Sequence, residues 1–425
     1  MADLSRTLPL KRSSVQSAHE RIKEHVQITP VLTCSTLSNL ASTPQSPEAL
    51  IGTHFEGQRP AHPRIHIFFK CENFQRIGAF KVRGAFHALS RLSKEELAKG
   101  VVTHSSGNHA QALALAARTY GIPAHIVMPT ISTPSKIAAT QGYGAKVYFS
   151  GSTSDEREAV VKDVIEDTGA ILVPPYDHPD IILGQGTMAL ELEEQAKDCI
   201  RKDPALSVHH KGEQEFTNGY RNGTNHTNGT HALSAVSEPG HLDAVIAPIG
   251  GGGMLSGIAT ALHGTGTYVF GAEPSFEGAD DARRGLAANK RIPTVKTLTI
   301  ADGLRTPVGE IPWSIISDKT RLRGIYAVTE EQILQAMRLV LERMKVVVEP
   351  SAVVGLAVAL YDEEFRGLVE REGGEEGWDI GVVLSGGNTT VEAIAKMFAV
   401  SEGKGERMEG KLGGRGERIA ENVAG

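Results

Sequence analysis

The chain has 425 residues, of which 40% are hydrophobic and 22% are charged, and its formal net charge is -6. This length favours two domains over one, and the composition is typical of a soluble globular protein. The negative net charge gives no reason to expect nucleic acid or an anionic membrane as partner. The three cysteines form no CxxC pair, which indicates a reducing compartment. Because no signal core and no bilayer-spanning stretch is present, we expect a cytosolic protein.

Short β-branched runs alternate with stretches of helical periodicity along the chain. Between these runs, apolar residues recur at intervals of three and four, which is typical of helices that cover a sheet. The alternation predicts a parallel α/β architecture buried on both faces. The strand candidates, in chain order, are residues 65–69, 100–105, 124–128, 145–149, 170–174, 243–250, 267–273 and 380–387.

Three segments interrupt this alternation. Residues 41–64 are rich in Pro, Gly and His. Residues 203–240 contain a polar run rich in Asn and Gly, which predicts a disordered surface loop. The tail, residues 401–425, consists largely of Gly, Glu, Lys and Arg, and we expect it to be frayed.

The first motif with chemical character is "GAFKVRGA", residues 78–85. Lys81 follows Gly78, Ala79 and Phe80 and precedes a helix-like stretch, surroundings that a solvent-facing lysine does not need. A lysine that acts as a nucleophile must be held in place and must lose its proton, which burial promotes. We therefore treat Lys81 as a candidate catalytic residue.

The next motif, "THSSGNHAQALALAA" at residues 103–117, ends a strand in small polar residues and then opens a helix. Backbone N–H groups at Gly107 and Asn108 could bind a substrate carboxylate. Ser105 or Ser106 could instead simply cap the helix.

Four consecutive glycines, Gly250 to Gly253, join a strand to a helix in "APIGGGGML". Such a turn lets backbone N–H groups converge on an anion, so phosphate binding is favoured over a turn that merely tolerates glycine. The run is neither a Walker loop nor G-x-G-x-x-G, because Ser256 stands at the sixth position from Gly251. Glu273 lies 20 residues after Gly253, where a ribose-binding acid could sit, so a nicotinamide dehydrogenase remains an alternative.

The last motif is "VVLSGGNTTVEA", residues 382–393. Ser385 ends a buried strand, and Gly386 and Gly387 leave room for a flat ligand. The alternative is a strand-to-helix turn with Asn388 as its cap.

The motifs "ENFQRIGAFKVRGA", "SSGNHAQALALAA", "GQGT", "PIGGGGMLSG" and "SGGN", in this order, resemble those of fold type II enzymes that use pyridoxal 5′-phosphate (PLP). The resemblance is strongest to the branch of eukaryotic serine racemase, threonine/serine dehydratase and threo-3-hydroxyaspartate ammonia-lyase. It implies a tryptophan synthase β-like α/β fold of two open, twisted, mostly parallel sheets flanked by helices. We expect residues 1–99 and 178–425 to form a large PLP-binding domain and residues 100–177 a small mobile domain.

The resemblance also assigns roles to single residues. Lys81 matches the lysine that binds PLP covalently, and Phe80 matches the aromatic residue beside the ring. The other cofactor contacts are matched by Asn108 at the ring hydroxyl, Ser385 at the pyridine nitrogen, Glu349 near the ring, and Gly250, Gly251, Gly252, Gly253 and Met254 around the phosphate. The loop that binds the substrate carboxylate is matched by Ser105, Ser106, Gly107, Asn108 and His109.

The reaction implied is removal of the Cα proton of L-serine or L-threonine by Lys81. Loss of water then gives a keto acid and ammonia, or Ser106 returns a proton from the other face and racemises the substrate. A neutral serine at the pyridine nitrogen makes PLP a weaker electron sink, which favours elimination or quick proton return. Elimination from threo-3-hydroxyaspartate and a non-catalytic amino-acid sensor remain alternatives.

Residues 271–285, "GAEPSFEGADDARRG", resemble the family's divalent-cation site. The matching ligands are Glu273, the carbonyl of Ala279, and Asp281, with Asp280 or Glu277 as alternatives; oxygen ligands suit Mg²⁺, Mn²⁺ or Ca²⁺. A solvated acidic turn is the other interpretation. The resemblance further implies a homodimer activated by ATP.

Arg157 lies where related enzymes can place a cation near a distal substrate carboxylate. A surface arginine in the first turn of a helix is the more ordinary interpretation of the same residue.

Overall fold

The computed structural model describes residues 4–105, 107–151, 153–210 and 240–399. Ser106, the predicted tail at 401–425 and most of the predicted loop at 203–240 lie outside the described residues. Within the described part of the chain, no helix has both the length and the apolar character needed to cross a bilayer.

The larger of two sheets has six strands in the order β1-β2-β10-β7-β8-β9. Only β1 runs antiparallel, and it pairs with β2 at the edge; the other neighbours pair in parallel. Every residue of β7 and β10 is buried, as expected for central parallel strands covered on both faces. The strands are β1 (Val31–Thr33), β2 (Ile65–Cys71), β7 (Ala244–Pro248), β8 (Tyr268–Pro274), β9 (Gly324–Val328) and β10 (Trp378–Leu384).

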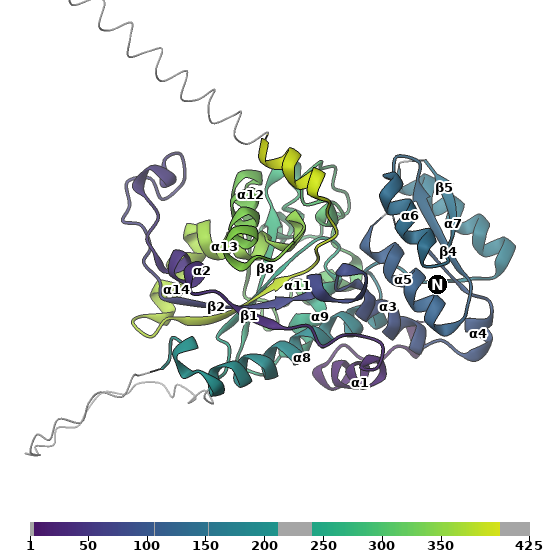
Figure 1. The fold of residues 1–425 in the computed structure, drawn as a ribbon, viewed down its shortest axis with the longest axis horizontal. Coiled ribbons are helices and arrows are strands. Elements are labelled where there is room, and N and C mark those ends of the chain that lie inside the picture. Colours follow the sequence, from purple (N-terminus) through teal and green to yellow (C-terminus); the bar gives the residue numbers. More distant parts are fainter. Residues whose placement is uncertain (1–3, 106, 152, 211–239, 400–425) are drawn as a thin grey trace, which may run out of the picture.

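The smaller sheet has four parallel strands in the order β5-β4-β3-β6, and it lies at one end of the molecule (Figure 1). Its strands are β3 (Val101–His104), β4 (Ala124–Pro129), β5 (Lys146–Ser150) and β6 (Ile171–Leu172). The two open, mostly parallel sheets confirm the predicted fold class. Sequence periodicity missed β1 and β9, since β1 is only three residues long and lies at the edge, and three residues of β9 are half-exposed.

Helices cover both faces of the sheets. The longest of the described helices is α8, which Pro179 starts, while the ring nitrogen Nδ1 of His178 accepts a hydrogen bond from the N–H of Asp180. The helices are α1 (Arg12–Ile22), α2 (Ser35–Ser42), α3 (Lys81–Ser90), α4 (Lys94–Ala98), α5 (Asn108–Tyr120), α6 (Pro134–Gly142), α7 (Ser154–Thr168), α8 (Pro179–Lys202), α9 (Gly253–Leu262), α10 (Asp281–Ala288), α11 (Glu310–Ile316), α12 (Glu330–Leu339), α13 (Val354–Tyr361) and α14 (Glu363–Gly373).

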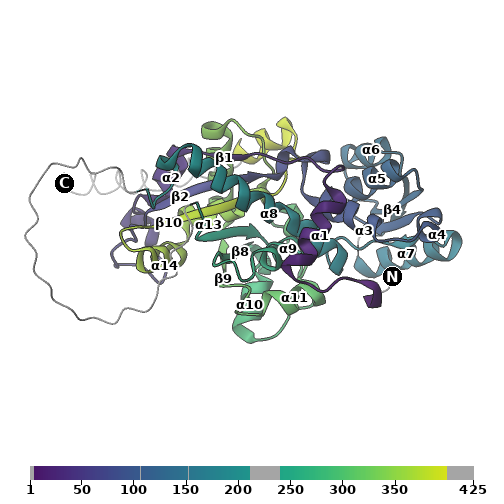
Figure 2. The ribbon, with the colours of Figure 1, turned by 90° about the horizontal axis from the view of Figure 1, so that it is seen from below.

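The core consists of apolar layers on the faces of the sheets. On one face of the larger sheet, α2, α12, α13 and α14 bury their apolar side chains. On the other face, α1, α8 and α9 do the same, while α3 and α5 pack against the smaller sheet. Figure 2 shows α3, α8 and α9 together between the two sheets.

Candidate active site

Lys81 is the first residue of α3, and it lies half-buried between the two sheets. Its Nζ donates a hydrogen bond to the carbonyl oxygen of Pro175 at 2.8 Å and lies 5.3 Å from the centroid of the Phe80 ring. Burial lowers the pKa of Lys81 to about 8. At neutral pH this amine is therefore unprotonated far more often than an ordinary lysine, as a nucleophile or base requires.

The four glycines form the turn between β7 and α9, as the sequence predicted. Gly252 has a φ of 85°, a left-handed conformation that favours glycine. A Cβ at Gly251 would lie 2.2 Å from Cγ of Tyr176, so a side chain there has no room. Gly253 opens α9, whose first N–H groups carry positive partial charge. The turn therefore fits a phosphate, and Met254 lies buried directly behind it.

The segment Pro175–Tyr176 connects Lys81 to this turn. Pro175 accepts the hydrogen bond of Lys81, and the backbone of Tyr176 packs on Gly253, where an added Cβ would lie 3.0 Å from its carbonyl oxygen. The lysine amine and the glycine turn thus lie on either side of one dipeptide. A single ligand with a carbonyl at one end and a phosphate at the other matches this arrangement, and PLP is such a molecule.

Ser385 is brought to Lys81 by pairing of two backbone segments that are far apart in sequence. The N–H of Phe80 donates to the carbonyl oxygen of Ser385 at 3.1 Å, and Ala79 forms an antiparallel bridge with Gly386. Ser385 is buried at the end of β10. The neutral serine that the sequence predicted for the pyridine nitrogen is therefore a close neighbour of the lysine.

Asn108, Glu349 and Asn388 form a hydrogen-bonded chain between α5 and the larger sheet. Asn108 Nδ2 donates to Glu349 Oε1 at 3.0 Å, and Asn388 Nδ2 donates to Asn108 Oδ1 at 2.8 Å. The N–H of Asn388 also donates to Glu349 Oε2 at 3.1 Å. Burial raises the pKa of Glu349 to about 7 against the opposing effect of these hydrogen bonds. The sequence suggested only a capping role for Asn388, whereas the structure makes it a partner of two predicted site residues.

The loop before α5 presents the other predicted substrate contacts. The N-cap of α5 is Gly107, which has no capping side chain, and its N–H donates to Oγ of Ser105 at 3.3 Å. His109 is buried and bonds the carbonyl oxygen of Val173 at 3.1 Å. Burial, helped by the charge of Lys81, lowers the pKa of His109 to about 3, so this side chain is neutral and lies within reach of the lysine's charge.

The acidic residues of 273–281 form a separate cluster. Glu273 is fully buried, and its two oxygens each accept a backbone N–H of α10 at 2.9 Å. Burial and the charge of Asp281 raise the pKa of Glu273 well above its ordinary value, and burial raises that of Asp281 to about 6. A buried carboxylate bonded in this way is poorly placed to bind the ribose of a dinucleotide.

The alternative cation ligands Asp280 and Glu277 are engaged in hydrogen bonds, as is Asp281, whose Oδ2 accepts the N–H of Val308 at 3.0 Å. Both oxygens of Asp280 accept from arginines of α10, and these guanidinium groups outweigh burial and lower its pKa. Glu277 bonds the N–H of Leu298 at 3.0 Å. No group of three His, Cys, Asp or Glu side chains in the described ranges is arranged to hold a metal, so a cation here needs carbonyl and water ligands as well.

Comparison with known proteins identifies the class to which this site belongs. The chain is a member of the pyridoxal-phosphate dependent enzyme family, whose model matches residues 56–210 and 211–386. It is 36% identical over 391 residues to serine racemase from Arabidopsis thaliana, a match that covers 92% of this chain and 96% of the relative. It is also 36% identical to L-threo-3-hydroxyaspartate ammonia-lyase from Saccharomyces cerevisiae, covering 91% and 96%.

A solved structure of maize serine racemase has a TM-score of 0.70 and 34% identity to this chain, with 93% of this chain and 99% of that one covered. The predicted family and fold type are therefore confirmed, and the chain is an enzyme of the PLP-dependent class. The nicotinamide dehydrogenase interpretation of the glycine run is wrong, because the chain belongs to the pyridoxal-phosphate dependent enzyme family.

Proposed function

We propose that this enzyme removes the Cα proton of L-serine or L-threonine and then either eliminates water, giving a keto acid and ammonia, or returns a proton to racemise the substrate. The observation that carries the proposal is the Lys81 amine, with its pKa of about 8, held between the glycine turn and Ser385. When bound, PLP supplies the electron sink for the charge left at Cα.

The chain's own groups would divide the remaining work. Lys81 Nζ takes the Cα proton from one face, and its low pKa keeps it able to do so. The N–H groups and side chains of residues 105–109 bind and orient the substrate carboxylate at the start of α5. Ser385 would hold the pyridine nitrogen through a neutral hydroxyl, which adds no charge there. Because residues 100–177 carry the smaller sheet and this loop, we propose that they move to exclude water once substrate binds.

Ser106 is proposed to deliver a proton to the second face. We expect Ser106→Ala to lower D-serine formation from L-serine by about a hundredfold, the usual loss when a positioned acid is removed. Keto acid release should change by only a few fold, since Lys81 still removes the Cα proton. Chiral chromatography measures the first rate and a coupled keto acid assay the second. Equal loss of both products would contradict this role, and absence of both keto acid and D-serine from wild-type enzyme would contradict the proposed function.

Elimination from threo-3-hydroxyaspartate is a second candidate, favoured by Arg157. This residue of α7 is half-buried rather than fully exposed. Burial lowers the pKa of His104 and the charge of Arg157 lowers it further; the same charge partly opposes the raised pKa of half-buried Tyr176. The charge of Arg157 is therefore felt at His104, which precedes the carboxylate-binding loop, and at Tyr176, which packs on the glycine turn.

We expect Arg157→Met to raise the KM for L-threo-3-hydroxyaspartate by about tenfold or more, because a charge-assisted hydrogen bond to the distal carboxylate is lost. The KM for L-serine, which has no such carboxylate, should change little. Lys162→Met, on the exposed side of the same helix, serves as the control. Equal changes for the two substrates would remove hydroxyaspartate from the proposal.

A divalent cation is proposed to bind between Glu273, Asp281 and the carbonyl of Ala279. Two buried carboxylates with raised pKa values repel each other, and a cation would relieve that repulsion. We expect Mg²⁺ or Mn²⁺ to raise the thermal midpoint of the chelator-treated enzyme through linkage, by several degrees at saturating ion. The increase should disappear in Asp281→Asn and persist in Asp280→Asn. A thermal midpoint that none of Mg²⁺, Mn²⁺ and Ca²⁺ raises would contradict the proposed cation site.

The proposal also includes a homodimer and activation by ATP, both implied by the resemblance of the sequence. Sedimentation velocity and initial rates with increasing ATP test them separately. A monomer in sedimentation would contradict the proposed homodimer, and a rate that ATP leaves unchanged would contradict the proposed activation. Neither result would affect the proposed reaction.

A further inference from the structure

The motif "GQGT", residues 184–187, has no role in the proposed chemistry, yet it lies at the contact of the three helices that build the site. The helix α8 passes between α3, which begins with Lys81, and α9, which begins at the glycine turn. Gly184 and Gly186 are two residues apart and therefore point to nearly opposite sides of α8. One faces α3 and the other faces α9.

The contact of Gly184 with α3 leaves no room for a methyl group. A Cβ there would lie 2.7 Å from the carbonyl oxygen of Arg83 and 2.7 Å from Cα of Gly84. Both of these are backbone atoms, which cannot rotate aside as the end of a long side chain can. This contact occurs less than one helical turn after Lys81, so a shift of α3 here moves the lysine with it.

The contact of Gly186 with α9 is equally close. A Cβ at Gly186 would lie 2.5 Å from the carbonyl oxygen of Gly257, and one at Gly257 would lie 2.4 Å from the carbonyl oxygen of Ile182. Gly257 is one turn after Gly253, the last glycine of the phosphate turn. A shift of α9 at this point therefore moves the turn.

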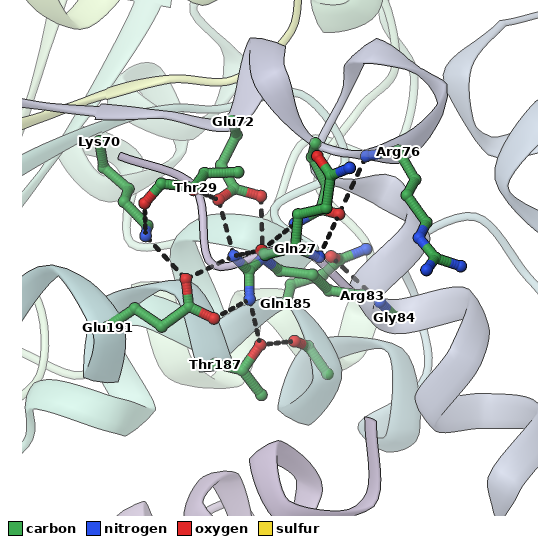
Figure 3. Close-up of polar contacts among 12 residues, drawn as sticks. Gln27, Thr29, Lys70, Glu72, Arg76, Arg83, Gly84, Gln185, Thr187 and Glu191 are labelled. Carbon is green, nitrogen blue, oxygen red and sulfur yellow. Dashed lines mark hydrogen bonds and ion pairs between the residues drawn. The ribbon is translucent and has the colours of Figure 1, made fainter. Parts of the chain in front are cut away.

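Polar contacts fix the same helices in register. Figure 3 shows Gln185, Thr187 and Glu191 of α8 directed at α3. Gln185 Oε1 accepts the N–H of Gly84 at 3.2 Å, and Thr187 Oγ1 accepts from Arg83 at 3.2 Å while donating to the carbonyl oxygen of Gly184 at 2.8 Å. The α3 helix can thus neither approach α8 more closely nor slide along it without breaking these bonds.

We infer that Gly184 and Gly186 are positioning residues that set the distance between Lys81 Nζ and the glycine turn, so that one PLP molecule is held at both ends. The inference rests on the proposed role of Lys81 and extends it to residues that touch neither cofactor nor substrate. Attachment forms a C=N bond between Nζ and the aldehyde carbon of PLP, with loss of one water. A misplacement of about an ångström between reacting groups can cost about a hundredfold in such a step.

The test compares two ligands that differ only at the aldehyde. PLP uses both the turn and the lysine, whereas 4-deoxypyridoxine 5′-phosphate, with a methyl group in place of the aldehyde, uses the turn and the ring contacts but cannot bond to Lys81. We expect Gly184→Ala to weaken PLP binding by about tenfold or more, as overpacking of a close contact would. Binding of the deoxy analogue should change by less than about threefold. Gly186→Ala, which overpacks the contact with α9 on the opposite side of α8, should give the same pattern. It replaces Gly184→Ala if that variant does not fold.

The control is Leu192→Ala, which opens a cavity where α8 packs on Gly381 of β10. It should lower the thermal midpoint and leave the ratio of the two affinities unchanged. Equal losses of affinity for both ligands in the glycine variants, or no loss in folded protein, would overturn the inference.

Borohydride reduction followed by peptide mass spectrometry shows whether PLP attaches at Lys81 in the wild type. If PLP does not attach at Lys81, the proposed function is overturned as well. If PLP attaches but the ratio of the two affinities is unchanged in the glycine variants, only the inferred positioning role of Gly184 and Gly186 is overturned.

Discussion

We expect Lys81→Ala to lower L-serine turnover by roughly a thousandfold or more, the largest effect of any single substitution in this chain. The variant would lose both the proposed nucleophile that holds PLP and the proposed base that takes the Cα proton. Its pKa of about 8 suits both tasks, and its amine bonds Pro175, the neighbour of Tyr176, which packs on the glycine turn. Initial rates of keto acid release and borohydride trapping of PLP measure the two losses.

The matched control is Lys94→Ala, which removes a lysine from the first turn of α4, the next helix along the chain. It should keep wild-type rates. Addition of a small primary amine to the Lys81→Ala enzyme should restore part of the activity, because a free amine can replace the missing base. Substantial turnover of serine by Lys81→Ala alone would end the proposed mechanism.

Arg83→Met should be the most destabilising of the substitutions considered, by about 3–5 kcal/mol of unfolding free energy. Arg83 is fully buried and bonds Glu72 at 2.8 Å and Glu191 at 2.7 Å, while Lys70 bonds Glu191 at 2.7 Å (Figure 3). Two positive and two negative charges balance in the core. Removing the guanidinium leaves two buried carboxylates with one ammonium group, and the uncompensated charge is costly.

Urea unfolding followed by circular dichroism measures this loss. Arg83→Lys should lie between the wild type and Arg83→Met, since it keeps the charge but loses the forked geometry. The control, Arg59→Met, breaks an exposed ion pair with Glu370 and should cost less than about 1 kcal/mol. If Arg83→Met and Arg59→Met were equally stable, the buried network would have no net role in holding α3 to α8.

The parts of the site that sequence predicted are those carried by local patterns. Lys81 and the four glycines each lie in one short motif at the junction of elements, so their character is visible without the fold. Ser385 and Asn108 needed the resemblance, because a serine after a strand and an asparagine at a helix start are common in any α/β protein. Most of the strands followed from runs of β-branched residues.

What sequence did not reveal depends on partners far apart along the chain. Tyr176 has no motif of its own, and only its packing on Gly251 shows that it belongs to the site. Asn388 looks like a helix cap until Asn108 and Glu349 are found beside it. The charges of Arg83 and Lys70 resemble ordinary surface residues in sequence, and only the fold shows that both are buried and paired.

The position of β10 has a consequence for biosynthesis. This strand is the last of the larger sheet to be made, yet it inserts between β2 and β7, and its end supplies the backbone partner of Phe80. A nascent chain that emerges from the ribosome in order therefore carries its lysine and glycine turn for a long interval before the strand that joins them exists. Completion of the catalytic centre and closure of the sheet are then one late event, so a chain that stops translation early yields no partly active product.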